Sequence, residues 1–443
     1  MLIPQEELEV LYDVDVVVIG GGASGVCAAV TASRNGAKTL LVEQRGFAGG
    51  TGAFTAIPAF CPYTDGVNIV SQGIAYEILQ KVKEQSNDEC QAMNKEKLDW
   101  VTIDTETYKR VCDELLIESK VEVLFHTVCS QVLYDGSKIQ GLVISNKNGR
   151  SVIKGKVYID ASGDADIAYM SGVPVLKGDK DDSTVQPGTM CFVVAGIDYD
   201  KCMQYSGTQE DTQFAELVKE AQRKGDIPKG RERVSSYSWV SKSIASFNFG
   251  HVFGVDGTDA KSLTKANIEG RKLVKIYVNF LRKYVPGFEK ANLVYSGEQV
   301  GIRESRRIEA DYMMSVDDFK QMRSFTDEIA RNSYFIDVHL PNQNSTMVME
   351  YLPKGKSHGI PYRCMLPRGK DNLLVVGRTI GSDRLINSAL RVMPNCFTMG
   401  QAAVTAAYLA SREEIGYRDI KIEELQKLLV EQGAKIDLIK NKV

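Results

Sequence analysis

Short, continuously apolar runs flank Ala-rich segments near both ends of the chain. Residues 15–19 read Asp-Val-Val-Val-Ile and residues 38–42 read Lys-Thr-Leu-Leu-Val. Such runs, rich in β-branched residues and without alternation, are typical of strands buried on both faces of a parallel sheet. The Ala-rich segment 23–34 between them predicts a helix, which Asn35-Gly36 would end. The pattern therefore predicts a strand, a helix and a second strand.

Similar runs continue the sheet further along the chain. Residues 121–125, 131–134 and 139–144 are followed by 157–160, with Asp-Gly at 135–136 and Asn-Gly at 148–149 as hairpin signals. They predict a β-meander that returns to the parallel sheet. The run 372–376 predicts a last buried strand, and an Ala-rich segment from about 398 to 410 predicts a long helix, capped by Asn395 or Thr398.

The turn between the first strand and helix has the glycine spacing of a dinucleotide-binding loop. Gly20 permits the tight turn, Gly22 lets the backbone approach a pyrophosphate, and Gly25 lets the helix pack closely on the strand. The start of the helix offers N–H groups to the phosphates. Glu43, at the end of the second strand, is placed to bind ribose hydroxyls. An ordinary βαβ unit with a glycine-rich turn is the structural alternative.

A second glycine cluster favours a flavin dinucleotide over a nicotinamide dinucleotide. It follows Glu43 directly and reads Gly46-Phe-Ala-Gly-Gly-Thr-Gly52. A flavin needs such a loop because its ribityl–pyrophosphate arm crosses exposed backbone, whereas a nicotinamide enzyme has no particular need of it. A flexible loop is the alternative. Two distant segments complete the predicted site: the small residues after the strand at 157–160, and Gly377-Arg378 after the strand at 372–376.

These segments together resemble the FAD-dependent oxidoreductases of the fumarate reductase-like, glutathione-reductase-type flavoprotein superfamily, and most closely its bacterial branch. The matching pieces span nearly the whole chain: 15–43, 46–51, 159–166, 186–187, 301–308, 360–363, 377–378 and 388–403. The resemblance also implies that Arg391 and Asn395 lie near the isoalloxazine ring. We expect FAD to be bound by Gly20, Gly22, Ala23, Ser24, Gly25, Glu43, Gln44, Arg45, Gly49, Gly50, Thr51, Val128, Ala161, Gly163, Asp164, Gly377, Arg378, Asn395, Thr398, Gly400 and Gln401.

The predicted fold class is α/β, with a Rossmann-like FAD-binding domain of parallel sheet plus β-meander and an inserted α+β substrate domain. The cofactor segments lie at both ends of the chain, so the FAD-binding domain is discontinuous, about 1–186 and 361–443. The substrate domain spans about 187–360, where the sequence is more aromatic and carries a basic helical stretch at 264–284. We expect the substrate to bind between the domains.

Four residues are candidates for catalysis. Arg303 stands in an arginine cluster suited to a bidentate grip on a carboxylate. His251 and His339 are candidates for a general acid or base, because histidine as a residue type titrates near neutral pH, and Arg363 precedes the last cofactor segment. For each of them a structural role is the alternative.

Composition narrows the class of protein. The 443 residues carry a net charge of −3, which gives no reason to expect nucleic acid or an anionic membrane as partner. No apolar run reaches about eighteen residues, which excludes a transmembrane helix, and the N-terminus lacks the basic region of a signal peptide. Nine scattered cysteines and four histidines form no zinc pattern, so we expect no metal and a reduced, cytoplasmic environment.

The sequence thus predicts an FAD-dependent oxidoreductase that transfers hydride between noncovalent FAD and a small polar organic substrate, such as a carboxylate or a polyol. Only one dinucleotide fingerprint is present, so the electron acceptor or donor is a separate, unidentified molecule. Two alternatives stay open: a redox-neutral FAD enzyme for elimination or isomerisation, and a flavin-binding protein without catalysis. The sequence is compatible with an oligomer.

Overall fold

The computed structural model describes residues 6–178, 183–229, 232–234, 236–339 and 348–438. Its largest sheet is organised around the long strand β8 (Gly149–Asp160). On one side β8 pairs in parallel with β1 (Val10–Ile19), which is followed outward by β2 (Thr39–Val42) and β5 (Glu122–Leu124). On its other side β8 pairs first with antiparallel β7 (Lys138–Asn146) and then, at its carboxyl end, with parallel β19 (Leu373–Val375).

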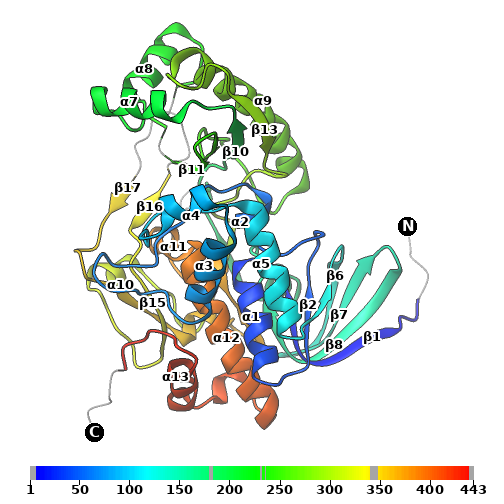
Figure 1. Cartoon of the computed structure of the whole chain (residues 1–443). Coiled ribbons are helices and arrows are strands. Elements are labelled where there is room, and N and C mark those ends of the chain that lie inside the picture. The colour runs from blue at the N-terminus through cyan, green and yellow to red at the C-terminus, as the bar shows by residue number, and fades with distance from the viewer. Residues whose placement is uncertain (1–5, 179–182, 230–231, 235, 340–347, 439–443) are drawn as a thin grey trace.

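The strand β8 therefore belongs to two structures at once. It is a member of the parallel sheet β5-β2-β1-β8-β19, and it is the last strand of the meander β6 (Val128–Asp135), β7 and β8. The meander extends to the right in Figure 1. Both predicted hairpin turns are confirmed, as is the predicted α/β class with a Rossmann-like FAD-binding fold.

Alternate residues of the strands enter two different hydrophobic clusters. Val16, Val18 and Leu41 pack with helices α1 (Ala23–Arg34), α3 (Ile74–Gln85), α5 (Thr105–Glu118) and α12 (Met393–Glu413). Val17 and Leu40 pack with residues of the meander on the opposite side. Because successive side chains of a strand point to opposite faces, burial of both faces explains the continuous apolar runs in the sequence.

The middle of the chain forms a second, antiparallel sheet. Its strand order is β11 (Tyr237–Ser241), β12 (Ile244–Phe247), β10 (Phe192–Ala195) and β13 (Asn292–Ser296). The helices α7 (Tyr199–Gln209), α8 (Ala215–Lys224) and α9 (Ala260–Tyr284) accompany it at the top of Figure 1. The basic stretch predicted to be helical at 264–284 lies within α9.

The hydrophobic clusters divide the chain close to the predicted boundary at 187 but well before the predicted boundary at 360. Every buried member of the second cluster lies between Met190 and Ile302. Residues from Met314 to Val338 instead pack into the first cluster, together with α1 and α12. We therefore propose that the inserted domain ends near Ile302, and that the segment after it belongs to the FAD-binding domain.

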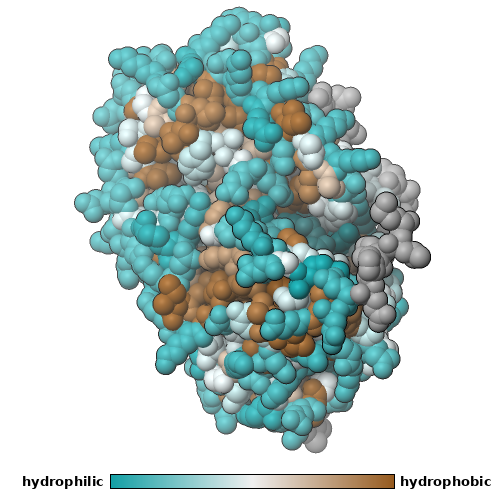
Figure 2. Space-filling model, turned by 90° about the vertical axis from the view of Figure 1, so that its right-hand side faces the viewer, coloured by the Kyte–Doolittle hydropathy of each residue, from teal (hydrophilic) through white to brown (hydrophobic). Residues whose placement is uncertain are grey.

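The remaining elements are short or peripheral. They are α2 (Thr51–Phe54), β3 (Ala59–Phe60), α4 (Asp88–Asn94), β4 (Val101–Thr102), α6 (Asp166–Met170), β9 (Val175–Lys177), β14 (Arg306–Ile308), α10 (Val316–Lys320), β15 (Glu328–Asn332), β16 (Ile336–Val338), β17 (Val348–Glu350), β18 (His358–Pro361), η1 (Tyr362–Met365), η2 (Gly377–Thr379), α11 (Arg384–Leu390), η3 (Tyr417–Asp419) and α13 (Ile422–Glu431). One side of the molecule is mostly hydrophilic, with apolar patches on its upper and lower halves (Figure 2). Among the described helices, none is long and apolar enough to cross a membrane.

Candidate active site

A cavity of about 1020 Å³ is lined by loops of the parallel sheet and by residues of the second domain. Gly20 follows β1, Glu43 follows β2, Ala161 follows β8, and Val376 follows β19; all four line the cavity. Because these strands are parallel, their carboxyl ends meet at one edge of the sheet, which is where ligands bind in open α/β folds. The volume is at the top of the range for small-molecule pockets, roughly 300–1,000 Å³.

The glycines of the first turn serve two different purposes. Gly20 has a φ of +101°, and a Cβ there would lie 2.4 Å from the carbonyl oxygen of Ala161; at Gly25 a Cβ would lie 1.7 Å from the oxygen of Gly20. Both positions need glycine for the fold itself. At Gly22 a Cβ would meet only the Cα of Gly50, at 3.8 Å. The missing side chain of Gly22 therefore leaves space in the cavity, as a closely bound phosphate requires.

Two helices begin at the cavity without a side-chain cap. The N-cap of α1 is Gly22 and that of α12 is Val392; neither makes a side-chain capping bond, and neither helix has an acidic residue in its first turn. Both N-cap residues line the cavity. Uncapped helix starts present N–H groups and partial positive charge, which suits phosphates and the negative charge of a reduced flavin.

Glu43 is buried beside the glycine turn. Its Oε2 accepts a hydrogen bond from the Gly21 N–H at 2.7 Å, and its Oε1 accepts one from the Arg45 N–H at 2.8 Å. Burial raises the pKa of Glu43, although these N–H groups oppose the shift. Arg45 lies over the Phe54 ring at 3.8 Å and donates to Gln299 at 2.7 Å. Through Arg45 the predicted ribose end of the cavity contacts the segment that follows β13.

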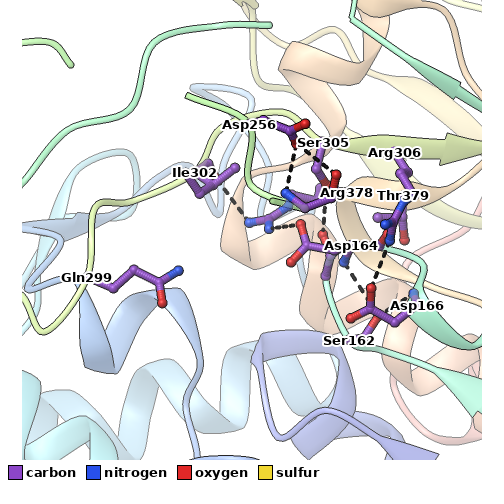
Figure 3. Close-up of polar contacts among 12 residues, drawn as sticks. Ser162, Asp164, Asp166, Asp256, Gln299, Ile302, Ser305, Arg306, Arg378 and Thr379 are labelled. Carbon is purple, nitrogen blue, oxygen red and sulfur yellow. Dashed lines mark hydrogen bonds and ion pairs between the residues drawn. The ribbon is translucent and has the colours of Figure 1, made fainter. Parts of the chain in front are cut away.

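Arg378 bridges two segments of the cavity wall. Its Nη2 pairs with Asp164 at 2.9 Å, and its Nη1 donates to the carbonyl oxygen of Ile302 at 2.9 Å (Figure 3). The Nε of Arg378 is buried and has no hydrogen-bond partner among the described residues. An unsatisfied donor in a ligand cavity fits a bound acceptor such as a phosphate or flavin oxygen.

Another part of the cavity wall is built around Asp337. His339 Nε2 lies 3.2 Å from one carboxylate oxygen of Asp337, and Arg391 Nη2 lies 3.5 Å from the other. The Tyr334 hydroxyl donates to the same oxygen as Arg391, at 3.3 Å. Burial opposes the charge of Asp337, but His339, Arg391 and Arg303 hold the pKa of its carboxyl well below the usual range. Asp337 is therefore an anion that orients His339 and Arg391.

The second domain and its boundary contribute His251 and Arg303 to this part of the wall. The rings of His251 and His339 meet edge to face with centroids 5.0 Å apart. Arg303 Nη1 donates to the carbonyl oxygen of Pro187 at 2.6 Å and to Thr189 Oγ1 at 3.0 Å, and Nη2 donates to Asn248 at 3.4 Å. The structure thus brings three of the four predicted catalytic residues together in one cavity.

A comparison with protein families decides the class. The model of the family described as FAD dependent oxidoreductase matches residues 15–429, nearly the whole chain. The chain belongs to this FAD-dependent oxidoreductase family. FAD is accordingly its cofactor, and the uncapped helix starts, the space at Gly22 and the unsatisfied Arg378 Nε fit that group.

Solved structures with low similarity include other proteins of related fold. One is a geranylgeranyl bacteriochlorophyll reductase-like protein from Thermoplasma acidophilum, with 14% identity over 96% of this chain and 84% of the other, and a TM-score of 0.47. Another is p-nitrophenol 4-monooxygenase PnpA from Pseudomonas putida, with 9% identity over 95% and 85% of the two chains and a TM-score of 0.49. No curated protein matches the chain. Such low values indicate neither a substrate nor a reaction.

Most of the predicted cofactor residues of this FAD-dependent oxidoreductase line the cavity: Gly20, Gly22, Ala23, Ser24, Glu43, Gln44, Arg45, Gly50, Thr51, Ala161, Gly163, Asp164, Gly377 and Arg378. Gly25, Gly49 and Gly400 lie behind its wall. The Gly49 N–H donates to Gly21 at 2.8 Å, and a Cβ at Gly400 would lie 2.2 Å from the oxygen of Ser24. These glycines let the glycine turns and α12 pack closely on α1.

The other predicted cofactor residues are also outside the lining. Val128 is exposed at the start of β6. Asn395 Nδ2 donates to Asn332 at 2.6 Å, Thr398 Oγ1 donates to the oxygen of Asn395 at 2.9 Å, and Gln401 contacts the turn before α3. The expectation that Asn395 or Thr398 caps this helix is wrong, because α12 begins at Met393, with proline in its first turn.

Arg363, the fourth predicted catalytic residue, does not line the cavity. Its guanidinium pairs with Asp327 at 2.9 Å and lies over the Tyr312 ring. Two other members of the arginine cluster also have partners outside the cavity lining: Arg306 pairs with Asp166 at 2.8 Å, and the buried Arg307 pairs with Glu304 at 2.7 Å. Only Arg303 of that cluster reaches the cavity.

The sequence interpretation did not single out Asp337, Tyr334 or Asn248. One signal for Asp337 was present, because Asp337 and His339 are two residues apart at the strand β16 and therefore share a face. Nothing local marks Tyr334 or Asn248. Both are brought to the site by the packing of distant segments.

Proposed function

We propose that this oxidoreductase transfers hydride between a small polar organic substrate and noncovalently bound FAD. The observation that supports it is one cavity with a backbone-lined end for the dinucleotide and a charged end for the substrate. When bound, FAD supplies a two-electron acceptor or donor next to the substrate. The residues of the chain bind, orient and protonate or deprotonate the substrate.

His251 is proposed as the group that exchanges a proton with the substrate. It lines the cavity, and its edge-to-face contact with His339 fixes one side of its ring. Asp337 positions His339, and Arg303 is oriented by the oxygens of Pro187 and Thr189. General acid–base catalysis by a positioned histidine typically contributes about 10²- to 10⁴-fold to a rate.

Noncovalent attachment is supported by the chemistry of the cavity thiols. Burial raises the pKa of Cys61 and of Cys191 to about 12, and that of Cys396 to about 11. Thiols at such values are poor nucleophiles because the thiolate is the reactive form.

All nine cysteines are free thiols, which supports the proposed cytoplasmic location. Membership in the fumarate reductase-like, glutathione-reductase-type superfamily is likewise part of this proposal.

The test is anaerobic mixing of the FAD-loaded protein with small carboxylates and polyols while the absorbance of oxidised flavin is followed. We expect bleaching by a substrate, and recovery of the colour when a separate electron acceptor is added. Turnover of a compound without bleaching at any time would contradict hydride transfer. For noncovalent attachment, acid precipitation should release the colour into the supernatant, and colour retained in the pellet would contradict it.

A further inference from the structure

The charged end of the cavity has more fixed cations than anions. Arg303, Arg391 and Asp337 all line the cavity, and Asp337 is the carboxylate that the two arginines act on. Asp337 is shared, since it lies 3.2 Å from His339 and 3.5 Å from Arg391, and Arg303 also acts on it electrostatically. Two guanidinium groups that share one carboxylate leave a net positive charge in this cluster. An anionic ligand would balance that charge.

Arg391 is held so that part of its hydrogen-bonding capacity is left for a ligand. Its Nη2 donates to the backbone oxygen of Asp337 at 3.1 Å and to Gln186 Oε1 at 3.4 Å. Its Nε is buried and has no hydrogen-bond partner among the described residues. A guanidinium fixed through one nitrogen while another is unsatisfied is preorganised for an oxygen ligand.

Gln186 adds a second unsatisfied donor at the same place. Its Oε1 accepts hydrogen bonds from the backbone N–H of His339 at 3.1 Å and from Arg391 at 3.4 Å, whereas its amide nitrogen takes part in neither. That Nε2 is buried and has no partner among the residues that the structure describes, and Gln186 is only 2% exposed. Gln186 lies behind the cavity lining, whereas Arg391 is part of it, so the Nε of Arg391 is the donor for which a ligand in the cavity is the natural acceptor.

Arg303 follows directly after Ile302, at the boundary between the two domains. Its guanidinium is oriented by backbone and hydroxyl oxygens of Pro187 and Thr189, and Pro187 directly follows Gln186. The two arginines therefore come from separate segments, and each is positioned by neutral oxygens or by Asp337. Rigid placement of guanidinium groups is the usual way to recognise the planar, two-oxygen carboxylate.

Building on the proposed function, we propose that the charged end of the cavity is a carboxylate site, so that the substrate is a small organic acid whose carboxylate is bound by Arg391 and Arg303. This narrows the substrate class, since a polyol would leave the positive charge unbalanced. Two other arginines of the cavity, Arg45 and Arg378, are each close to a carboxylate of their own, that of Glu298 at 3.7 Å and that of Asp164 at 2.9 Å.

The experiment measures binding rather than turnover. Acetate, lactate and benzoate, each paired with its neutral amide, are titrated by calorimetry into the FAD-loaded protein. The amide has nearly the same shape as the acid but no charge, so the ratio of the two affinities isolates the carboxylate. We expect at least one acid to bind about 10- to 100-fold tighter than its amide.

Variants assign this preference to the arginines. Arg391→Gln and Arg303→Gln should each remove most of it, and Arg391→Lys should keep part of it, because lysine retains the charge without the planar fork. Arg368→Gln is the control, since Arg368 is exposed and pairs with Glu309 away from the cavity. Circular dichroism and FAD content show whether each variant is folded. If Arg391→Gln is not folded, the Arg391→Lys protein is used to test the role of Arg391.

The experiments distinguish failure of the carboxylate site from failure of hydride transfer. If acids and amides bind alike, or if no acid of the series binds, the carboxylate site is wrong even if a polyol bleaches the flavin. If acids bind with the expected preference and a bound acid turns over without bleaching, the carboxylate site is supported and hydride transfer is wrong. A preference that survives in both glutamine variants would also overturn the assignment to these arginines.

Discussion

One part of the cavity is lined by glycine turns and helix starts together with Glu43, Arg45 and Arg378, and another part by the cluster around Asp337. The dinucleotide end consists of glycine turns and two uncapped helix starts at the edge of a parallel sheet. The other end consists of Asp337, His339, His251 and two arginines. The difference teaches that cofactor binding depends on the shape of the main chain, whereas substrate recognition depends on which side chains the fold brings together. Each end should therefore be sensitive to a different kind of substitution.

The largest effect is expected at the backbone end. In Gly22→Val the new side chain would enter the space left for the dinucleotide, while the nearest protein atom to its Cβ, at 3.8 Å, leaves the fold room for it. We expect the affinity for FAD to fall at least about 100-fold, roughly 2.7 kcal/mol. The absorbance ratio of flavin to protein after gel filtration measures this.

Gly207→Val is the matched control for that substitution. Gly207 lies in α7 with open space around its Cβ position and does not line the cavity. The Gly207→Val protein should retain FAD. A Gly22→Val protein with a full complement of FAD would refute the assignment of this end.

The opposite result is expected for His251→Asn. This substitution removes the proposed proton-transfer group but leaves the glycine turns intact, so FAD content should be unchanged. The turnover number should fall about 100-fold or more. Loss of FAD with normal turnover per bound flavin would contradict the division of the cavity into two ends.

The third prediction concerns His358, which does not line the cavity, whereas His251 and His339 do. His358 is fully buried; its Nε2 lies 2.9 Å from Asn332 Nδ2, and its Nδ1 lies 3.0 Å from the oxygen of Gly359. Burial lowers the pKa of His358 to about 4. The neutral ring satisfies both contacts, so we assign His358 a structural role.

The pH dependence of stability follows from that shift. Between pH 6.5 and 4 the unfolded chain binds a proton at His358 that the folded protein excludes, so the free energy of unfolding should fall as the pH is lowered. This fall in the free energy of unfolding is at most about 3 kcal/mol. His358→Gln should lose this part of the pH dependence in denaturant titrations. An identical slope in the variant would show that His358 is not its source.

The smallest effect is expected for Arg378→Lys. Lysine keeps the positive charge but cannot hold Asp164 and the oxygen of Ile302 with two nitrogens at once. We expect about 10-fold weaker FAD binding, roughly 1.4 kcal/mol, with turnover per bound FAD unchanged. Arg368→Lys, at an exposed position away from the cavity, should bind FAD normally. A larger loss of turnover than of FAD affinity would place Arg378 in the chemistry of the substrate.

The predicted elements around the first glycine turn are local in the sequence. The strand β1, the turn at Gly20–Gly22, the helix α1 and the strand β2 follow one another within the first 42 residues. The order of these segments, their hydrophobic periodicity and their glycines predict this local structure directly. Asn395, Thr398 and Gln401 lie inside α12, and Val128 is exposed at the start of β6; only the three-dimensional packing shows that none of them lines the cavity.

What the sequence determined by itself is the fold class, the phosphate-binding turn and the family. Apolar runs and glycine spacing express these directly, since they reflect backbone geometry over a few residues. What only the tertiary structure decided is which charged side chains share the cavity. Arg303 was separated from Arg306 and Arg307 of its own cluster, and Asp337 was joined to Arg391, because burial of a charged group requires a partner that distant segments supply.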